Sequence, residues 1–87
     1  MLKVSVISPE KVLYEGEAES VVVPAFDGEM GILRGHAPLM TLIGNGVMRL
    51  ATGGSSAEVK FSVAGGFLQV ADDHVRVVTE NAAAVSA

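Results

Sequence analysis

The sequence of 87 residues contains no cysteine, which excludes a disulfide framework, a thiolate metal site and a cysteine nucleophile. Charged residues are also few, at 18%, and the net charge is −4. Because binding by counterion release needs positive charge, nucleic acid is not an expected partner. A chain of this length forms one small domain, and its stability must come from the burial of apolar side chains.

A long hydrophobic run is absent as well. No stretch approaches the roughly 20 apolar residues that a membrane-spanning helix needs. The longest uncharged run, residues 35–48, is interrupted by Pro38 and by Gly44, Asn45 and Gly46. The N-terminal residues show neither the apolar core nor the cleavage site of a signal peptide. We therefore expect no direct membrane insertion and a cytoplasmic location.

The apolar half of the composition favours strands. Apolar residues make up 49% of the chain and are dominated by fourteen valines and eleven alanines, whereas aromatic residues contribute only 5%. Leu2, Val4 and Val6 alternate with polar residues, and residues 57–63 show the clearest alternation. Turn signals every six to ten residues give eight to ten short strands and no helix. This pattern predicts an all-β sandwich or flattened barrel.

Two glycine-containing turns are expected in the middle of the chain. Asn45 and Gly46 lie between the apolar runs 39–43 and 47–52, and this dipeptide favours the type I′ turn of a hairpin. A second turn is expected at residues 53–56. The sequence therefore predicts that the two apolar runs pair with each other.

The C-terminal third has three expected features. Residues 65–66, both glycine, predict a bend or bulge where another backbone approaches closely. Residues 72–73, both aspartate, predict the next turn. The last strand is expected at residues 74–80. The β-sandwich domain is thus assigned to residues 1–80, and residues 81–87 to a short alanine-rich tail.

Acidic residues alternate near the N-terminus. Strands are expected at residues 11–16 and 17–23, with Pro24 ending the second. Side chains two positions apart in a strand lie on one face, so three carboxylates are expected together there: Glu15, Glu17 and Glu19. Because their mutual repulsion is tolerable only in water, a solvated face is favoured over a cation site.

Catalytic signatures are missing. The only side chains that titrate near neutral pH without perturbation are His36 and His74, and neither lies in a motif for nucleophilic catalysis, phosphate binding or zinc binding. Asp72, Asp73 and His74 are consecutive, and consecutive strand residues point to opposite faces, which argues against a shared metal. The residues alone indicate an all-β domain without evident catalytic chemistry.

Glu29 and His36 leave alternatives open. Glu29 is a lone carboxylate expected at a loop tip, where it is either solvated or in contact with a partner. His36 lies among small and rigid residues and either satisfies backbone carbonyl groups or contacts a partner. An alternative function, a small β-barrel enzyme or ligand-binding module, would need both residues in one concave site.

Residues 28–43, Gly-Glu-Met-Gly-Ile-Leu-Arg-Gly-His-Ala-Pro-Leu-Met-Thr-Leu-Ile, closely resemble the signature loop of the epsilon subunit of F-type ATP synthases, called delta in mitochondria. Residues 6–16, 61–70 and 75–79 resemble the first hairpin and the closing strands of the same family. The resemblance covers essentially the whole chain.

The resemblance implies a flattened antiparallel β-sandwich of about ten short strands. It also implies a non-catalytic rotor subunit of the central stalk, which links the gamma subunit to the c ring and couples proton-driven rotation to ATP synthesis. Such a subunit is peripheral, on the cytoplasmic side of the energy-coupling membrane, and needs no cofactor or small-molecule substrate. The family's inhibitory C-terminal helices are not expected in the few residues after Asn81.

The resemblance also implies partner contacts at individual positions. Contacts with the c ring are implied at Gly28, Glu29 and Met30. Contacts with gamma are implied at Ser8, His36 and Thr41. Arg34 departs from the proline that the family often has before Gly-His, which removes a fixed φ and adds a cation beside the interface.

Overall fold

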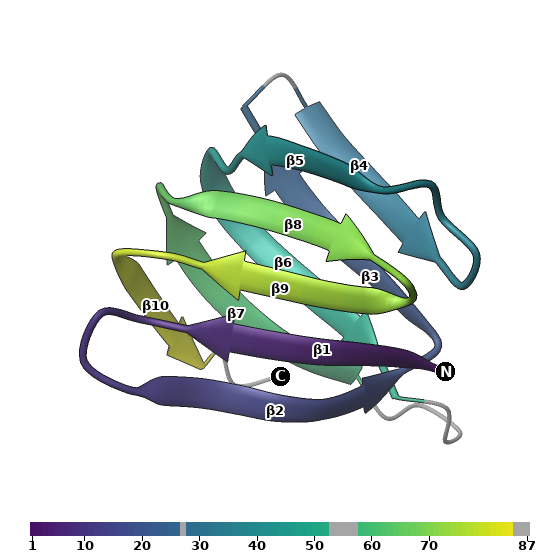
Figure 1. Cartoon of the computed structure of the whole chain (residues 1–87). Coiled ribbons are helices and arrows are strands. Elements are labelled where there is room, and N and C mark those ends of the chain that lie inside the picture. The colour runs from purple at the N-terminus through teal and green to yellow at the C-terminus, as the bar shows by residue number, and fades with distance from the viewer. Residues whose placement is uncertain (27, 53–57, 85–87) are drawn as a thin grey trace.

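The computed structural model describes residues 1–26, 28–52 and 58–84, which form ten strands and no helix (Figure 1). In chain order the strands are β1 (Leu2–Ile7), β2 (Val12–Ala18), β3 (Ser20–Ala25), β4 (Gly28–Leu33), β5 (Leu39–Leu42), β6 (Asn45–Ala51), β7 (Glu58–Ala64), β8 (Phe67–Ala71), β9 (His74–Val78) and β10 (Asn81–Ala84). The expected all-β class is confirmed.

The strands form two five-stranded sheets that face each other. Sheet A has the order β2-β1-β9-β8-β5 and lies in front in Figure 1, and sheet B has the order β10-β7-β6-β3-β4 and lies behind it. The named strand pairs are antiparallel except β1 and β9, which run parallel. The predicted sandwich is therefore correct, with one parallel pair in the centre of sheet A.

The core lies between the sheets and is built from the inward position of each alternating strand. Leu2, Val4 and Val6 are almost fully buried, as their period of two predicts. Phe61 is 5% exposed and meets Tyr14 edge to face, with ring centroids 5.9 Å apart. Aliphatic side chains from both sheets fill the rest of this core.

The β8–β9 turn confirms the prediction at residues 72–73. Asp72 and Asp73 have φ values of 51° and 60°, and Ala71 pairs with His74 across the turn. Two consecutive positive φ values belong to the type I′ turn, which matches the right-handed twist of the strands. Aspartate tolerates this region better than most residues because its short side chain can bond locally.

The hairpin predicted at Asn45 and Gly46 is wrong. Both residues lie inside β6, where Asn45 pairs with Ala64 in sheet B, whereas β5 pairs with β8 in sheet A. The chain crosses between sheets at Gly44, whose N–H donates to the Pro24 carbonyl oxygen at 2.7 Å. The two apolar runs thus belong to opposite layers, and long-range pairing overrides the local turn preference.

The predicted bend at residues 65–66 is confirmed. Here the chain passes from β7 in sheet B to β8 in sheet A, and Gly66 has a φ of 112°. A Cβ added at Gly66 would collide with the Val78 carbonyl oxygen and lie 2.7 Å from the Thr79 Cα. Thr79 closes the corner, since its Oγ1 donates to the Gly65 carbonyl oxygen at 2.8 Å.

The expected boundary at residue 80 is wrong. Strand β9 ends at Val78, and Asn81–Ala84 forms β10, which pairs with β7 from Asn81 to Ala84. The sandwich therefore includes residues that local sequence assigned to a tail, because their pairing with β7 has no local signature. The turn expected at 53–56 and the last residues, 85–87, lie outside the described part of the chain.

Two smaller boundaries also differ from the prediction. Strand β2 continues through Glu17 to Ala18, so the break falls at Glu19 rather than after Gly16. Pro24 lies within β3 and does not end it. The ladder from β3 to β6 extends only to Val22, so Pro24 lies beyond the part that pairs with β6.

Candidate interaction surfaces

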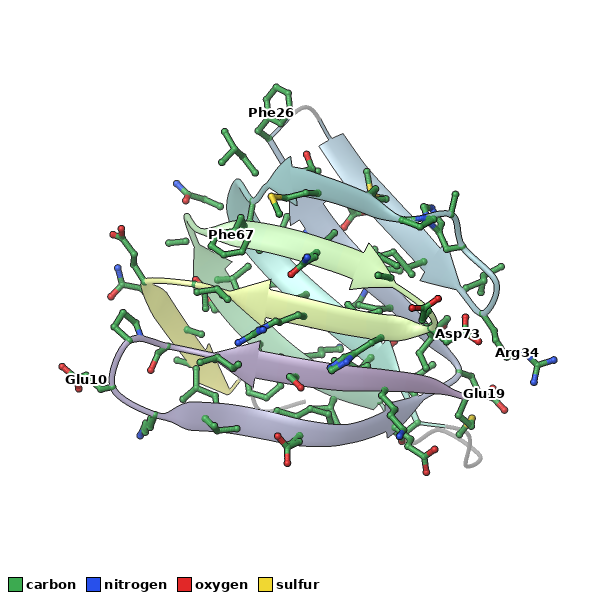
Figure 2. The ribbon with its side chains drawn as sticks, viewed as in Figure 1. Glu10, Glu19, Phe26, Arg34, Phe67 and Asp73 are labelled. Carbon is green, nitrogen blue, oxygen red and sulfur yellow. The ribbon has the colours of Figure 1, made fainter. Side chains whose placement is uncertain are left out.

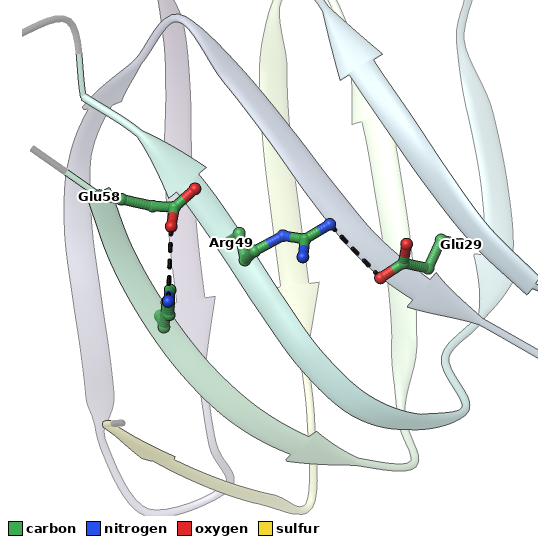
Figure 3. Close-up of polar contacts among 4 residues, drawn as sticks. Glu29, Arg49 and Glu58 are labelled. Carbon is green, nitrogen blue, oxygen red and sulfur yellow. Dashed lines mark ion pairs between the residues drawn. The ribbon is translucent and has the colours of Figure 1, made fainter. Parts of the chain in front are cut away.

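Glu29 lies on β4, at the edge of sheet B, and points outward. The structure places it second in this strand, not at the loop tip expected from the sequence. Its Oε2 is 3.5 Å from Arg49 Nη2, and the Glu29 side chain is 59% exposed (Figure 3). Met30 points inward and packs against the core, so Gly28 and Glu29 are the exposed members of the predicted c-ring group.

The outer face of sheet B carries a second ion pair. Lys60 Nζ lies 3.7 Å from Glu58 Oε1, and both side chains are partly exposed (Figure 3). Exposed pairs of this kind contribute only about 0.2–1 kcal/mol each, because water and salt screen them. These charges therefore keep the face polar without contributing much to stability.

His36 lies in the connection between β4 and β5, which is fastened to the β8–β9 turn. The Gly35 N–H donates to Asp73 Oδ1 at 2.6 Å, joining residues far apart in the sequence. The His36 N–H donates to the Leu33 carbonyl oxygen at 3.2 Å, and its Nδ1 donates to the Ala37 carbonyl oxygen at 2.7 Å. His36 thus satisfies a backbone carbonyl, one of the two roles expected for it.

Ser8 lies in the β1–β2 loop, where its Oγ exchanges hydrogen bonds with the backbone of Lys11 at 3.2 Å. It lines a depression of about 280 Å³ together with residues of the β9–β10 connection. Thr41 lies on β5 opposite Leu68 and is half-buried. Ser8 and the His36 loop lie at opposite ends of the sheet A strands, so the three positions predicted to contact gamma do not form one cluster.

The alternative of an enzyme or ligand-binding module requires Glu29 and His36 to converge, and they do not. The strand from Glu29 to Leu33 is extended, which separates its ends by about 13 Å, and His36 lies beyond Leu33. Neither residue lines the depressions that the structure describes. Within the described residues, no three acidic or histidine side chains come together as metal ligands.

The acidic alternation predicted near the N-terminus is only partly formed. Glu15 and Glu17 are exposed on β2, opposite Ser5 and Lys3 of β1. Glu19 is also exposed but lies between β2 and β3, outside both strands. The carboxylates therefore face solvent, as the solvated-face interpretation predicts.

Sequence reasoning missed an apolar row that crosses the outer face of sheet A. Each strand of the sheet contributes one outward residue through direct register: Val12, Ile7, Val78, Phe67 and Leu42. Val12 is 56% exposed and Leu42 is 62% exposed, whereas Phe67 is 37% exposed and visible at the start of β8 in Figure 2. Directly opposed side chains lie on one face, so these five form a continuous row.

Most of the remaining outward positions of sheet A are polar, and the apolar ones are Ala71 and Met40, which is 66% exposed. The next positions along the same strands are Glu15, Ser5, Arg76, Gln69 and Met40, and beyond them lie Glu17, Lys3 and His74. A shallow depression of about 490 Å³ lies at this polar end, between β1, β9 and β8. The outer face of sheet A therefore changes from apolar at one end of its strands to charged at the other.

The architecture defines a β-sandwich domain, in which Glu29 is exposed on an edge strand and Ser8 and His36 lie in loops. The family described as ATP synthase, delta/epsilon chain, β-sandwich domain, matches residues 1–85. The chain belongs to this family.

Curated relatives give the same assignment. The ATP synthase epsilon chain of Leptospira borgpetersenii is 48% identical over 82 residues, which cover 94% of this chain and 63% of the relative. The epsilon chain of Leptospira interrogans is 44% identical over the same shares of both chains. This chain thus spans less than two thirds of the length of these relatives.

Solved structures show the same fold at low sequence identity. A chain of the Euglena gracilis mitochondrial ATP synthase, in a structure of OSCP, F1 and the c ring, superimposes with a TM-score of 0.87 at 20% identity, covering 95% of this chain and 52% of that one. A chain of the Tetrahymena thermophila central stalk and c ring gives a TM-score of 0.76 at 12% identity, covering 94% and 65%. In the described ranges, no helix is long and apolar enough to cross a membrane.

Proposed function

We propose that this domain is a non-catalytic part of the central stalk of an ATP synthase. In this role it binds the gamma subunit and the c ring, and it transmits proton-driven rotation of the ring to ATP synthesis. Family membership supports the proposal, as does the likeness to chains from stalk and c-ring assemblies. The domain would then lie at the membrane surface as a peripheral part of the complex.

The observation that carries the proposal is the presence of two exposed faces with different chemistry. Sheet A presents the apolar row, and the edge of sheet B presents Glu29 beside Arg49. A domain that joins two partners needs two separate surfaces, and these lie on opposite layers of the sandwich. The geometry suits a linker better than an enzyme, whose groups must converge.

We assign the c-ring contact to Glu29 with Gly28, and the gamma contacts to Ser8, His36 and Thr41. Glu29 is exposed and already has a cationic neighbour, so its carboxylate is held near one position while remaining accessible. Met30 is assigned only through its backbone, because its side chain packs against the core. These positions follow the family resemblance, and Glu29 is also exposed, whereas Thr41 is half-buried.

The test compares two exposed glutamates of sheet B in the assembled ATP synthase. Glu29→Gln removes the proposed c-ring contact, and the matched control Glu58→Gln removes the other ion-paired carboxylate of the same face. We expect Glu29→Gln to lower ATP-driven proton pumping several-fold while ATP hydrolysis and the unfolding midpoint stay near the native values. Equal pumping by the two variants and the native enzyme would refute the assignment of Glu29.

A further inference from the structure

We propose that Arg49 is a positioning residue for Glu29, which it holds in the orientation that meets the c ring. This inference rests on the proposed function, and it adds a residue that the family resemblance does not assign. Arg49 lies on β6, two strands away from β4 in sheet B. Its effect on the contact therefore passes through the Glu29 carboxylate, with which it forms an ion pair.

The Arg49 side chain crosses β3 to reach Glu29. Arg49 is directly opposite Val22 on β3, and Val22 is directly opposite Gly31 on β4. This row has no side chain at its β4 end, and an added Cβ at Gly31 would have open space around it. The guanidinium extends over β3 toward that open end, and its Nη2 lies 3.5 Å from Glu29 Oε2 (Figure 3).

Lys60 biases the direction of the Arg49 side chain. The two cations are directly opposite each other on β6 and β7. Like charges in this position repel, so each side chain is favoured where it extends away from the other. Lys60 Nζ pairs with Glu58 of its own strand at 3.7 Å. The repulsion between the two cations therefore favours the pair that Arg49 forms with Glu29.

The ion pair restricts Glu29 without covering it. An exposed glutamate on an edge strand samples several rotamers, and a partner that binds its carboxylate must select one of them. Pairing with Arg49 makes part of that selection in advance, while the Glu29 side chain stays 59% exposed. A preorganised group binds more tightly because less conformational freedom is lost on contact.

Charge removal in the assembled ATP synthase tests this role. Arg49→Gln removes the positioning cation, and Lys60→Gln is the matched control, because it removes the other half-buried cation of the same face without touching Glu29. We expect Arg49→Gln to lower ATP-driven proton pumping about two- to fivefold relative to ATP hydrolysis, the range that one exposed ion pair supplies. Lys60→Gln should pump like the native enzyme. Equal losses in the two variants would overturn the inference.

The double variant distinguishes positioning from a separate effect of Arg49. If Arg49 acts through Glu29, the enzyme with both Glu29→Gln and Arg49→Gln should pump like the enzyme with Glu29→Gln alone. Losses that multiply would show that Arg49 acts independently and would overturn its role. The unfolding midpoints of the variants should stay near the native value, because exposed pairs contribute little to stability. A large fall in the midpoint of Arg49→Gln would instead make its effect structural.

A magnetic resonance measurement tests the pair without any partner. In this chain, labelled with a nitrogen isotope, Glu29→Gln should shift the Arg49 Nε–H resonance, whereas Glu15→Gln makes the same charge change on sheet A and should leave it in place. An unmoved resonance in Glu29→Gln would overturn the inference and leave the proposed function standing. Native pumping by Glu29→Gln would refute the proposed c-ring contact, and the inference would fail with it.

Discussion

The outer faces of the two sheets differ, although both belong to strands that alternate over one shared core. Sheet A exposes a continuous apolar row, whereas sheet B carries two ion pairs, Arg49 with Glu29 and Lys60 with Glu58. Outward side chains are free of the packing demands of the core. The comparison therefore teaches that the shared core constrains the inner faces, whereas the outer faces are free to differ in chemistry.

The largest effect on stability is expected from a substitution in the core that both sheets share. Phe61→Ala should lower the free energy of unfolding by about 3–5 kcal/mol, because it empties a buried site packed against Tyr14. Phe67→Ala changes the same residue type on the outer face and should cost much less. Urea denaturation of both variants measures the difference. Similar losses would mean that Phe67 is as much a core residue as Phe61.

A smaller effect is expected at the corner where the chain passes between the sheets. Gly66→Ala should cost about 2–4 kcal/mol, because the new Cβ would meet the backbone at Val78 and Thr79 and because L residues rarely adopt a φ of 112°. Gly65→Ala is the control, since a Cβ there has open space, although φ is also positive. The midpoint of thermal unfolding should be well below that of Gly65→Ala in the Gly66→Ala variant. Equal midpoints would contradict the close approach of the backbone at Val78 and Thr79 to Gly66.

The smallest expected effect concerns the fastening of the His36 loop to sheet A. Asp73→Asn keeps a side chain that tolerates positive φ but weakens the acceptor of the Gly35 N–H, and should cost about 1 kcal/mol. Asp72→Asn is the matched control in the same turn. Hydrogen exchange at the Gly35 amide should accelerate in Asp73→Asn alone. Unchanged exchange would show that the loop is held by other contacts.

The candidate site was only partly accessible to sequence reasoning. Glu29 and His36 stood out as a lone carboxylate and a histidine among small residues, and the resemblance of residues 28–43 to a known family then implied their partner contacts. The family match confirms that resemblance, and the contacts stay predictions. The apolar row was missed because Ile7 and Val78 follow buried valines, so each is locally indistinguishable from a residue of a buried strand. A search for apolar residues at outward positions could have identified its members but not their alignment.

The fold was predicted well where the local signals agreed with the long-range pairing of the strands. Alternation located most strands, and the positive φ values at residues 72–73 confirm the turn expected there. The parallel pairing of β1 with β9 and the strand at 81–84 had no such signal, because each depends on a strand distant in sequence. The Asn45–Gly46 dipeptide shows the same limit, since its turn preference lost to pairing within sheet B.

The sequence by itself determined the all-β class, the inward residues of most strands and the family. These properties follow from side-chain alternation, turn sterics and residue order, which are all written along the chain. Only the tertiary structure decided which strands are neighbours, and therefore which outward residues align as a row across sheet A. Register is a long-range property: it is set where distant strands form backbone hydrogen bonds over a common core.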